Sequence, residues 1–254
     1  MYAANFDLAL YARRIGLSQV PQATDFDAAA LCNMMQAQLR SITFENLDVQ
    51  AGKIVSLVPE QIVDKIVGQG RGGYCYEVNG LFAMALQALG FSYKFVACRP
   101  MFYPVRRPKT HMVLLVEADG DQWICDLGFG SYGIRAPIAL SSLEQVQQQD
   151  FDQFRLTTEQ SGAYVVQAWV DGQWLSQFGF EPYASEWVDF MPANYLNSTH
   201  PDTIFVQKLL VIKHHEQGRD ILLGDQLKQI RAEGTEVHQL SPQQREDILK
   251  LLLK

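Results

Sequence analysis

The sequence predicts an α+β fold in which helices come first, strands follow and a mixed segment ends the chain. Up to about residue 90, apolar residues recur at helical spacing. From residue 91 to 191 the pattern changes to short β-type runs separated by turn residues, and residues 192–254 mix both kinds of element. This order predicts three domains, 1–90, 91–191 and 192–254, with a cleft where they meet.

The first domain is expected to be a helical bundle. Its predicted helices are one around Leu8, Tyr11 and Ile15 and three over Asp27–Leu39, Pro59–Val67 and Tyr76–Leu89. Thr24 precedes the second helix and is its expected cap, because a threonine side chain accepts hydrogen bonds from the first helical turn. Gly90 follows the fourth helix, at the position where glycine commonly ends a helix.

The second domain is expected to be an antiparallel sheet or a small barrel. Its predicted strands are Lys94–Arg99, His111–Glu117, Gln122–Phe129, Phe154–Thr158, Tyr164–Val170 and Gln173–Phe178. Asp119-Gly120 and Asp171-Gly172 separate neighbouring runs and favour two-residue hairpin turns.

The third domain is expected to combine strands with a final helix. Its predicted strands cover Phe205–Lys213 and Arg219–Gln229. The helix is expected to begin at Ser241-Pro242, because serine caps helices and proline fits their first turn.

Composition and charge exclude several classes of protein. Of the 254 residues 48% are hydrophobic and 19% are charged, which favours a packed core over disorder. Lys and Arg total 21 against 28 Asp and Glu, and the net charge of −7 repels a phosphate backbone, so no nucleic-acid partner is expected. The N-terminus lacks the basic start and apolar run of a signal peptide, and no apolar stretch approaches the ~20 residues of a membrane span. A cytoplasmic protein without a membrane partner is therefore expected.

The four cysteines, Cys32, Cys75, Cys98 and Cys125, are expected to be free thiols. They form no Cys-x-x-Cys pair and lie far apart in the sequence, which fits neither a zinc site nor a dense disulfide framework. No metal site is expected. His200 lies in polar surroundings and is expected at the surface.

Cys75 is the candidate nucleophile. Gly72 and Gly73 allow a sharp turn, after which the cysteine falls in the first turn of an amphipathic helix. The helix dipole and the free backbone N–H groups at that position stabilise a thiolate, so a lowered pKa is predicted for Cys75. The alternative is a buried structural cysteine beside a helix start.

A nucleophilic cysteine needs a base and a group that orients the base, and His111 and Asp126 are the candidates. If the turn at Asp119-Gly120 has two residues, counting back along both strands places His111 opposite Gly128, with Asp126 as its diagonal neighbour on the same face. A three-residue turn would break this parity. A carboxylate among Ile, Cys, Leu and Phe neighbours is costly to bury unless a partner such as an imidazolium pairs with it.

Four segments resemble the arylamine N-acetyltransferase family. They are Phe44-Glu45-Asn46-Leu47-Asp48, Arg71-Gly72-Gly73-Tyr74-Cys75-Tyr76-Glu77-Val78-Asn79-Gly80, the strand that begins at His111, and Asp126-Leu127-Gly128-Phe129-Gly130. The segments span the first half of the chain in the family's order and spacing, and together they are highly specific.

The resemblance implies a fold and a catalytic core. It implies a Cys-His-Asp triad of Cys75, His111 and Asp126 in a cysteine-protease-like core. It also implies a helical first domain, a β-barrel second domain and an α/β third domain that acts as a lid.

The resemblance further implies an activity with its substrates. The implied reaction is ping-pong N-acetylation of arylamines and arylhydrazines through an acetyl-cysteine intermediate. The implied co-substrate is acetyl-CoA, with no tightly bound cofactor. The implied biological role is xenobiotic metabolism. Carried over by residue, Glu45 and Arg71 form a structural ion pair, while Phe44 and Phe129 lie beside the acceptor. Core packing is the alternative for both phenylalanines.

The chain departs from the family pattern at three places. Thr43 and Gln38 stand where the family usually has a proline and a histidine, and these changes are expected to alter local packing more than chemistry. The segment from Glu236 to Lys254 lacks the glycine and aromatic tail associated with the family.

A basic cluster at residues 106–109 either contacts the CoA phosphates or is solvated.

Two other functions fit the same residues. One is a related cysteine acyl transfer, as in an amide synthase or a transglutaminase-like amidase, with a different acyl donor. The other is a non-enzymatic binder of aromatic ligands, against which the complete set of Cys75, His111 and Asp126 argues.

Overall fold

Helices precede strands along the chain, and the predicted α+β class is confirmed. The structure, a computed structural model, describes residues 1–22, 27–130 and 132–254. Asp27 caps the second helix, whereas Thr24, the predicted cap, lies outside the described residues. The helices of the first region are α1 (Leu8–Arg14), α2 (Ala28–Ser41), α3 (Leu47–Gln50), α4 (Pro59–Val63), which continues as a π-helical turn over Asp64–Gly68, and α5 (Cys75–Leu89).

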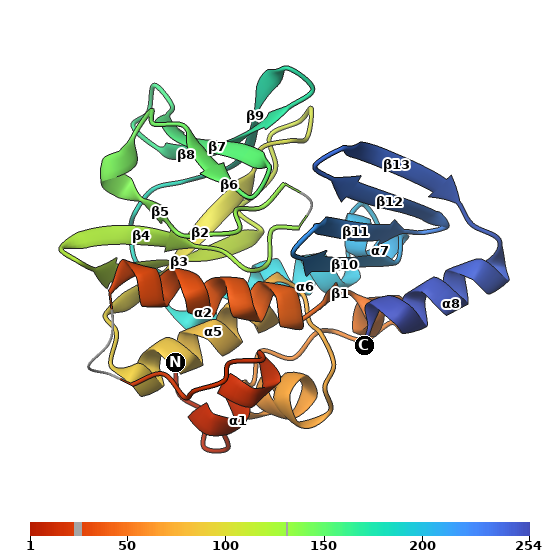
Figure 1. The fold of residues 1–254 in the computed structure, drawn as a ribbon, viewed down its shortest axis with the longest axis horizontal. Coiled ribbons are helices and arrows are strands. Elements are labelled where there is room, and N and C mark those ends of the chain that lie inside the picture. The colour runs from red at the N-terminus through yellow and green to blue at the C-terminus, as the bar shows by residue number, and fades with distance from the viewer. Residues whose placement is uncertain (23–26, 131) are drawn as a thin grey trace.

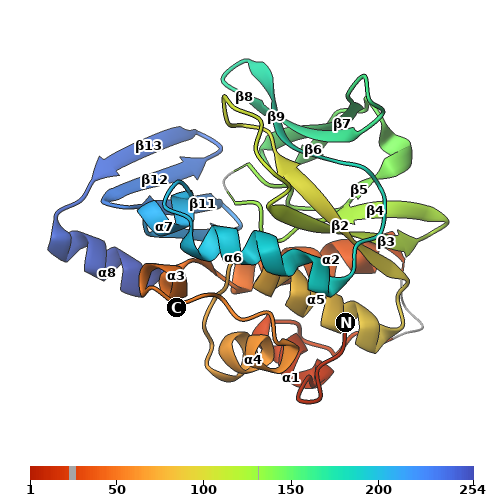
Figure 2. The same ribbon diagram turned by 180° about the vertical axis from the view of Figure 1, so that it is seen from behind.

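α5 is the central helix of the molecule. Its residues are apolar on almost every side, so the helix is buried without interruption from Cys75 to Leu86. Gly90 ends it in the left-handed conformation, with φ of 82°, as the sequence predicts. α5 packs against strand β3 and lies beneath the larger sheet together with α2 (Figures 1 and 2).

The second region forms a curled antiparallel sheet (Figure 1). Its strands follow the spatial order β5-β4-β3-β2-β9-β8-β7-β6. Ala118 pairs with Asp121 and Val170 with Gln173, which confirms both predicted two-residue turns. The strands are β2 (Tyr93–Pro100), β3 (His111–Ala118), β4 (Asp121–Cys125), β5 (Ile138–Ala139), β6 (Gln147–Gln149), β7 (Asp152–Thr158), β8 (Tyr164–Val170) and β9 (Gln173–Phe180).

A second, smaller sheet joins the first region of the chain to the last one. Its order is β1-β10-β11-β12-β13, and β1 (Phe44–Glu45) comes from the first region yet pairs with β10, Phe44 opposite Ile212. Thr43, just before β1, donates its hydroxyl hydrogen bond to the carbonyl of Leu252 at 2.7 Å. The remaining elements are α6 (Met191–Thr199), α7 (Ile204–Gln207), β10 (Leu210–His215), β11 (Gly218–Leu223), β12 (Gln226–Arg231), β13 (Gly234–Gln239) and α8 (Pro242–Leu252).

Two strand predictions in the last region are wrong in their bounds. The segment predicted as one strand over Phe205–Lys213 begins with the helical turn α7, because Asn46 binds the carbonyls of Phe205 and Lys208. The strand predicted over Arg219–Gln229 is a hairpin, β11 and β12, that turns at Gly224. The helix predicted at Ser241-Pro242 is confirmed as α8, capped by Ser241.

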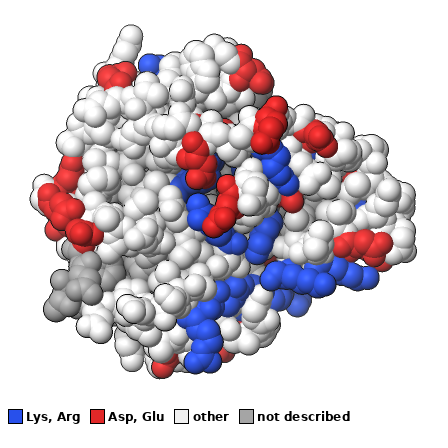
Figure 3. Space-filling model, viewed as in Figure 1, with Lys and Arg blue, Asp and Glu red and all other residues white. Residues whose placement is uncertain are grey.

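Ion pairs connect the two sheets. Arg219 on β11 is fully buried and places Nη1 2.6 Å from Oδ2 of Asp152 on β7, which Arg135 also contacts. On the face in Figure 3, Lys and Arg side chains gather along this junction and below it, whereas much of the curled sheet is uncharged. Since removing one partner of a buried ion pair is costly, these contacts hold the two sheets in place relative to each other. On the opposite side of the molecule, α6 spans the junction between the sheets (Figure 2).

Candidate active site

Cys75 is the first residue of α5 and follows a tight turn. A Cβ at Gly72 would lie 2.0 Å from the carbonyl oxygen of Thr43, so only glycine fits there. Gly73 donates its N–H to the same oxygen at 3.2 Å and accepts the N–H of Glu45 at 3.1 Å. The loop before the cysteine is therefore bound along its length to the segment that contains β1.

His111 and Asp126 meet beneath the curled sheet, as the hairpin parity predicts. The register runs from Ala118 opposite Asp121 to Leu114 opposite Cys125, where β4 ends. The ladder thus stops before the expected pair of His111 with Gly128, and the chain bends at residues 127–129. His111 Nε2 lies 2.8 Å from Asp126 Oδ2, and both side chains are buried.

Asp126 is held by three donors. Besides His111, the N–H of Gly128 donates to Oδ1 at 2.9 Å and Asn79 Nδ2 donates to it at 3.3 Å. Asn79, on α5, also accepts the N–H of Leu127 and donates to the carbonyl of Met112. One side chain thereby joins α5 to β3 and to the segment that follows β4.

Cys75 and His111 line the same cavity, which has an interior volume of about 170 Å³. Phe44 and Phe129 line it too, as do Phe102, Tyr103 and residues of α6 and α7. The Phe129 ring lies 5.1 Å from the His111 ring in an edge-on arrangement. The cavity therefore brings a thiol, an imidazole and aromatic faces to one place, which suits a flat aromatic ligand.

Arg107, His200 and Asp202 also line the cavity. Arg107 stacks over Tyr103, 4.7 Å from its ring centre, and donates to the carbonyl of Asp202 at 3.0 Å. In the basic cluster at residues 106–109, Arg106 pairs with Glu159 and Lys109 with Glu181. His200 is half exposed, as expected of a surface residue, but it also lines the cavity.

The pKa of Cys75 moves in the direction opposite to the prediction. Burial, reinforced by the Asp126 carboxylate, raises the pKa of this thiol. The N–H groups of Tyr76 and Cys75 donate to the sulfur and lower the pKa, but their effect is the smaller one. The predicted lowering of the Cys75 pKa at the helix start is therefore wrong.

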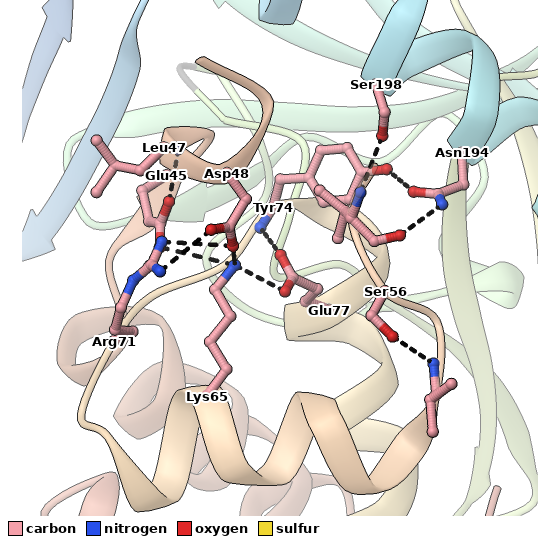
Figure 4. Close-up of polar contacts among 12 residues, drawn as sticks. Glu45, Leu47, Asp48, Ser56, Lys65, Arg71, Tyr74, Glu77, Asn194 and Ser198 are labelled. Atoms are coloured by element: carbon pink, nitrogen blue, oxygen red, sulfur yellow. Dashed lines mark hydrogen bonds and ion pairs between the residues drawn. The ribbon is translucent and has the colours of Figure 1, made fainter. Parts of the chain in front are cut away.

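Glu45 and Arg71 form an ion pair behind the loop that precedes Cys75. Arg71 Nη2 lies 2.6 Å from Glu45 Oε1, and Oε2 of this fully buried carboxylate accepts the N–H of Leu47 at 2.7 Å (Figure 4). Asp48, Lys65 and Glu77 extend the pair into a larger cluster.

Several residues that shape the site had no role in the sequence prediction. Asn79 and Glu77 stand in the segment that includes Cys75, and only their place in that motif singled them out. Lys65 lies in the predicted helix Pro59–Val67, and its ion pairs depend on tertiary contacts. Asn46 fixes the chain beside the cavity through α7, and only its place in the Phe44–Asp48 segment singled it out.

Gly128→Ala is expected to lower the reactivity of Cys75 at least about tenfold and to destabilise the fold by about 1–3 kcal/mol. A Cβ at this position would lie 2.5 Å from Cys75 Cα and 2.9 Å from its Cβ. Alkylation kinetics and thermal unfolding measure the two effects. Gly68→Ala is the matched control, since its Cβ would meet nothing within 4 Å. Unchanged Cys75 alkylation in Gly128→Ala would contradict this geometry.

The described residues contain no group of three or more His, Cys, Asp and Glu side chains arranged to hold a metal ion. The four cysteines are free thiols, as predicted. Among the described helices, none has the length and apolarity needed to cross a membrane.

Comparison with known proteins shows the family. A family model described as N-acetyltransferase matches residues 27–254. The chain is 33% identical over 196 residues to the arylamine N-acetyltransferase / N-hydroxyarylamine O-acetyltransferase of Salmonella typhimurium, covering 76% of this chain and 69% of that protein. It is 33% identical over 237 residues to the arylamine N-acetyltransferase of Mycolicibacterium smegmatis, covering 91% and 84%.

Solved structures agree with this result. The M. smegmatis arylamine N-acetyl transferase superposes with a TM-score of 0.90 at 32% identity, covering 98% of this chain and 93% of that chain. The Mycobacterium marinum arylamine N-acetyltransferase in complex with CoA superposes with a TM-score of 0.87 at 32% identity, covering 95% and 90%. This chain is an acyltransferase, and it belongs to the arylamine N-acetyltransferase family.

Proposed function

We propose that this enzyme transfers the acetyl group of acetyl-CoA to arylamines and arylhydrazines through an acetyl-cysteine intermediate. The observation that carries the proposal is the shared cavity of Cys75 and His111, with His111 bonded to Asp126 at 2.8 Å. The names of the relatives and the CoA complex of the M. marinum enzyme support the choice of acceptor and donor.

In the first half-reaction Cys75 takes the acetyl group from CoA. Because Nε2 of His111 is bonded to Asp126, Nδ1 is the ring nitrogen left to accept the thiol proton. The sulfur then attacks the thioester carbonyl carbon, the carbon–sulfur bond to CoA breaks, and the imidazolium returns its proton to the CoA thiolate. Asp126 stabilises the imidazolium between these two transfers.

The second half-reaction returns the free thiol. The amine nitrogen attacks the acetyl-cysteine carbonyl, His111 accepts the amine proton, and the Cys75 sulfur leaves and is protonated again. The N–H groups of Cys75 and Tyr76 already point at the sulfur, so they lie close to the oxyanion formed in both steps. Phe129 and Phe44 offer ring faces to a planar acceptor in the same cavity.

The donor is used as a co-substrate and leaves after each cycle. We place the reaction in the cytoplasm, because four free thiols in one chain are typical of a reducing compartment.

The test is the intact mass of the protein after mixing with acetyl-CoA in the absence of amine. We expect one acetyl adduct, located at Cys75 by peptide mapping and discharged by an arylhydrazine with release of the acetylated hydrazide. An adduct that forms only with other acyl donors would favour the related amide-forming chemistry. Absence of any adduct would refute the proposal.

A further inference from the structure

Five charged side chains meet directly behind the loop that precedes Cys75 (Figure 4). We name them the loop cluster; they are Glu45, Asp48, Lys65, Arg71 and Glu77. Lys65 Nζ lies 2.6 Å from Asp48 Oδ2 and 2.8 Å from Glu77 Oε1. The cluster holds three carboxylates against two cations.

Glu77 connects the loop cluster to the backbone that precedes the nucleophile. While its Oε1 faces Lys65, its Oε2 accepts the N–H of Tyr74 at 3.0 Å. Tyr74 is the residue immediately before Cys75 and caps α5. A charge-assisted hydrogen bond of this kind is about twice as strong as a neutral one.

The other side of the same turn is packed against Glu77 as well. A Cβ at Gly73 would lie 2.8 Å from Glu77 Cβ, so the glycine backbone rests on this side chain. The Tyr74 hydroxyl contacts Asn194 of α6, which in turn donates to the carbonyl of Val55 at 2.9 Å. Tyr74 is thus fixed at its ring by α6 and at its backbone by Glu77.

Lys65 is the cation that pairs with Glu77. Arg71 pairs with Glu45 and Asp48, whereas the ion pair of Glu77 is with Lys65. Burial raises the pKa of Glu77 to about 7, against the lowering effect of Lys65 and of the Tyr74 N–H, and Glu45 raises it further. The carboxylate therefore depends on Lys65 for its charge near neutral pH.

We propose that Glu77 and Lys65 act as positioning residues for the nucleophile: Glu77 holds the Tyr74 peptide that sets the direction of Cys75, and Lys65 holds Glu77. The proposal rests on the proposed function, because the placement of Cys75 matters for catalysis only if its sulfur reacts. It assigns to both residues an effect on the first half-reaction and none on the binding of the amine.

The primary test is Glu77→Gln, which conserves volume and removes the charge. An amide here loses one contact in either orientation, since its NH₂ faces either Lys65 or the Tyr74 N–H. We expect the pH-independent rate of Cys75 acetylation and alkylation to fall about tenfold to a hundredfold, while kcat/KM for the amine, which reports only on the second half-reaction, stays unchanged. Burial and Asp126 raise the Cys75 pKa most, and the Glu77 charge adds to them. The midpoint of the profile of Cys75 alkylation rate against pH should therefore move to lower pH.

Lys65→Met is the second test. Without its cation Glu77 is expected to be protonated near neutral pH, so this variant should reproduce both the lower rate and the shifted midpoint of Glu77→Gln. The double variant should be no slower than the slower single variant, because both changes remove the same contact. Lys65→Arg, which keeps the charge, should restore most of the rate.

Exposed residues of the same types provide the controls. Lys53→Met and Glu246→Gln alter side chains on the surface and should leave the alkylation profile unchanged. Glu77 and Lys65 variants that melt at a lower temperature but keep both the wild-type rate and midpoint would overturn the proposal and leave a structural role. If the wild-type enzyme forms no acetyl adduct, the proposed function fails instead, and alkylation of Cys75 still reports on positioning.

Discussion

Cys75→Ala is expected to abolish the acetyl adduct and to lower acetyl transfer by about 10⁴-fold or more. The sulfur is the only atom of this residue that can bond to the acetyl carbon, and the substitution removes it with little loss of volume at the start of α5. Transfer is measured as acetylated arylamine formed per enzyme, and adduct formation as a mass increase without amine.

Cys32→Ala is the matched control for this variant. Cys32 is a partly exposed thiol on α2, whereas Cys98 and Cys125 are buried in strands, where truncation leaves a cavity. Cys32→Ala should keep both the adduct and the rate. An adduct that persists in Cys75→Ala would show that another group accepts the acetyl group.

Asp126→Asn is expected to slow Cys75 acetylation by about 10³- to 10⁴-fold. The carboxylate accepts from His111 with one oxygen and from Gly128 and Asn79 with the other. An amide has a single oxygen. If that oxygen faces His111, the NH₂ group meets two donors. If it turns around, the NH₂ group meets Nε2 and leaves the imidazole proton on Nδ1, where it blocks transfer from the thiol.

Single-turnover mass spectrometry of the acetyl adduct measures this rate. Asp171→Asn, in the exposed turn between β8 and β9, makes the same chemical change away from the site. Thermal unfolding of both variants separates lost catalysis from lost folding. An acetylation rate of Asp126→Asn within tenfold of wild type would contradict the role given to this carboxylate.

Local patterns were enough to predict how His111 and Asp126 come together. Two-fold alternation along a hairpin and an Asp-Gly turn fix which side chains share a face, and the observed pairing of Ala118 with Asp121 has the expected parity. α5 is predictable from the local sequence as well, because an apolar run and Gly90 mark its extent and its end. That Cys75, His111 and Asp126 act as a triad stays a prediction.

Contacts between segments that are distant in the sequence could not be predicted from local patterns. β1 has two residues and pairs with β10 across more than 160 residues, so no local periodicity marks it. β13 is exposed along its whole length and therefore lacks the apolar alternation that identifies a strand. The Gly224-Asp225 turn carries a local hairpin signal, and it lies inside the segment Arg219–Gln229 that the sequence analysis predicts as one strand.

The direction of the Cys75 pKa shift was mispredicted for a physical reason. The sequence places the cysteine at a helix start, where backbone donors favour a thiolate. It does not reveal that the curled sheet covers this helix start and that a carboxylate lies nearby, and burial outweighs the donors.

The pairing of β1 with β10 bears on how the enzyme is made in the cell. Phe44 needs Ile212 as its strand partner, and Thr43 needs the carbonyl of Leu252 in α8. A ribosome that has released the first half of the chain has therefore exposed Cys75 without the strand neighbours that support its loop. Because distant pairings form late in folding, the loop before Cys75 gains these two contacts only after β10 and α8 have been synthesised.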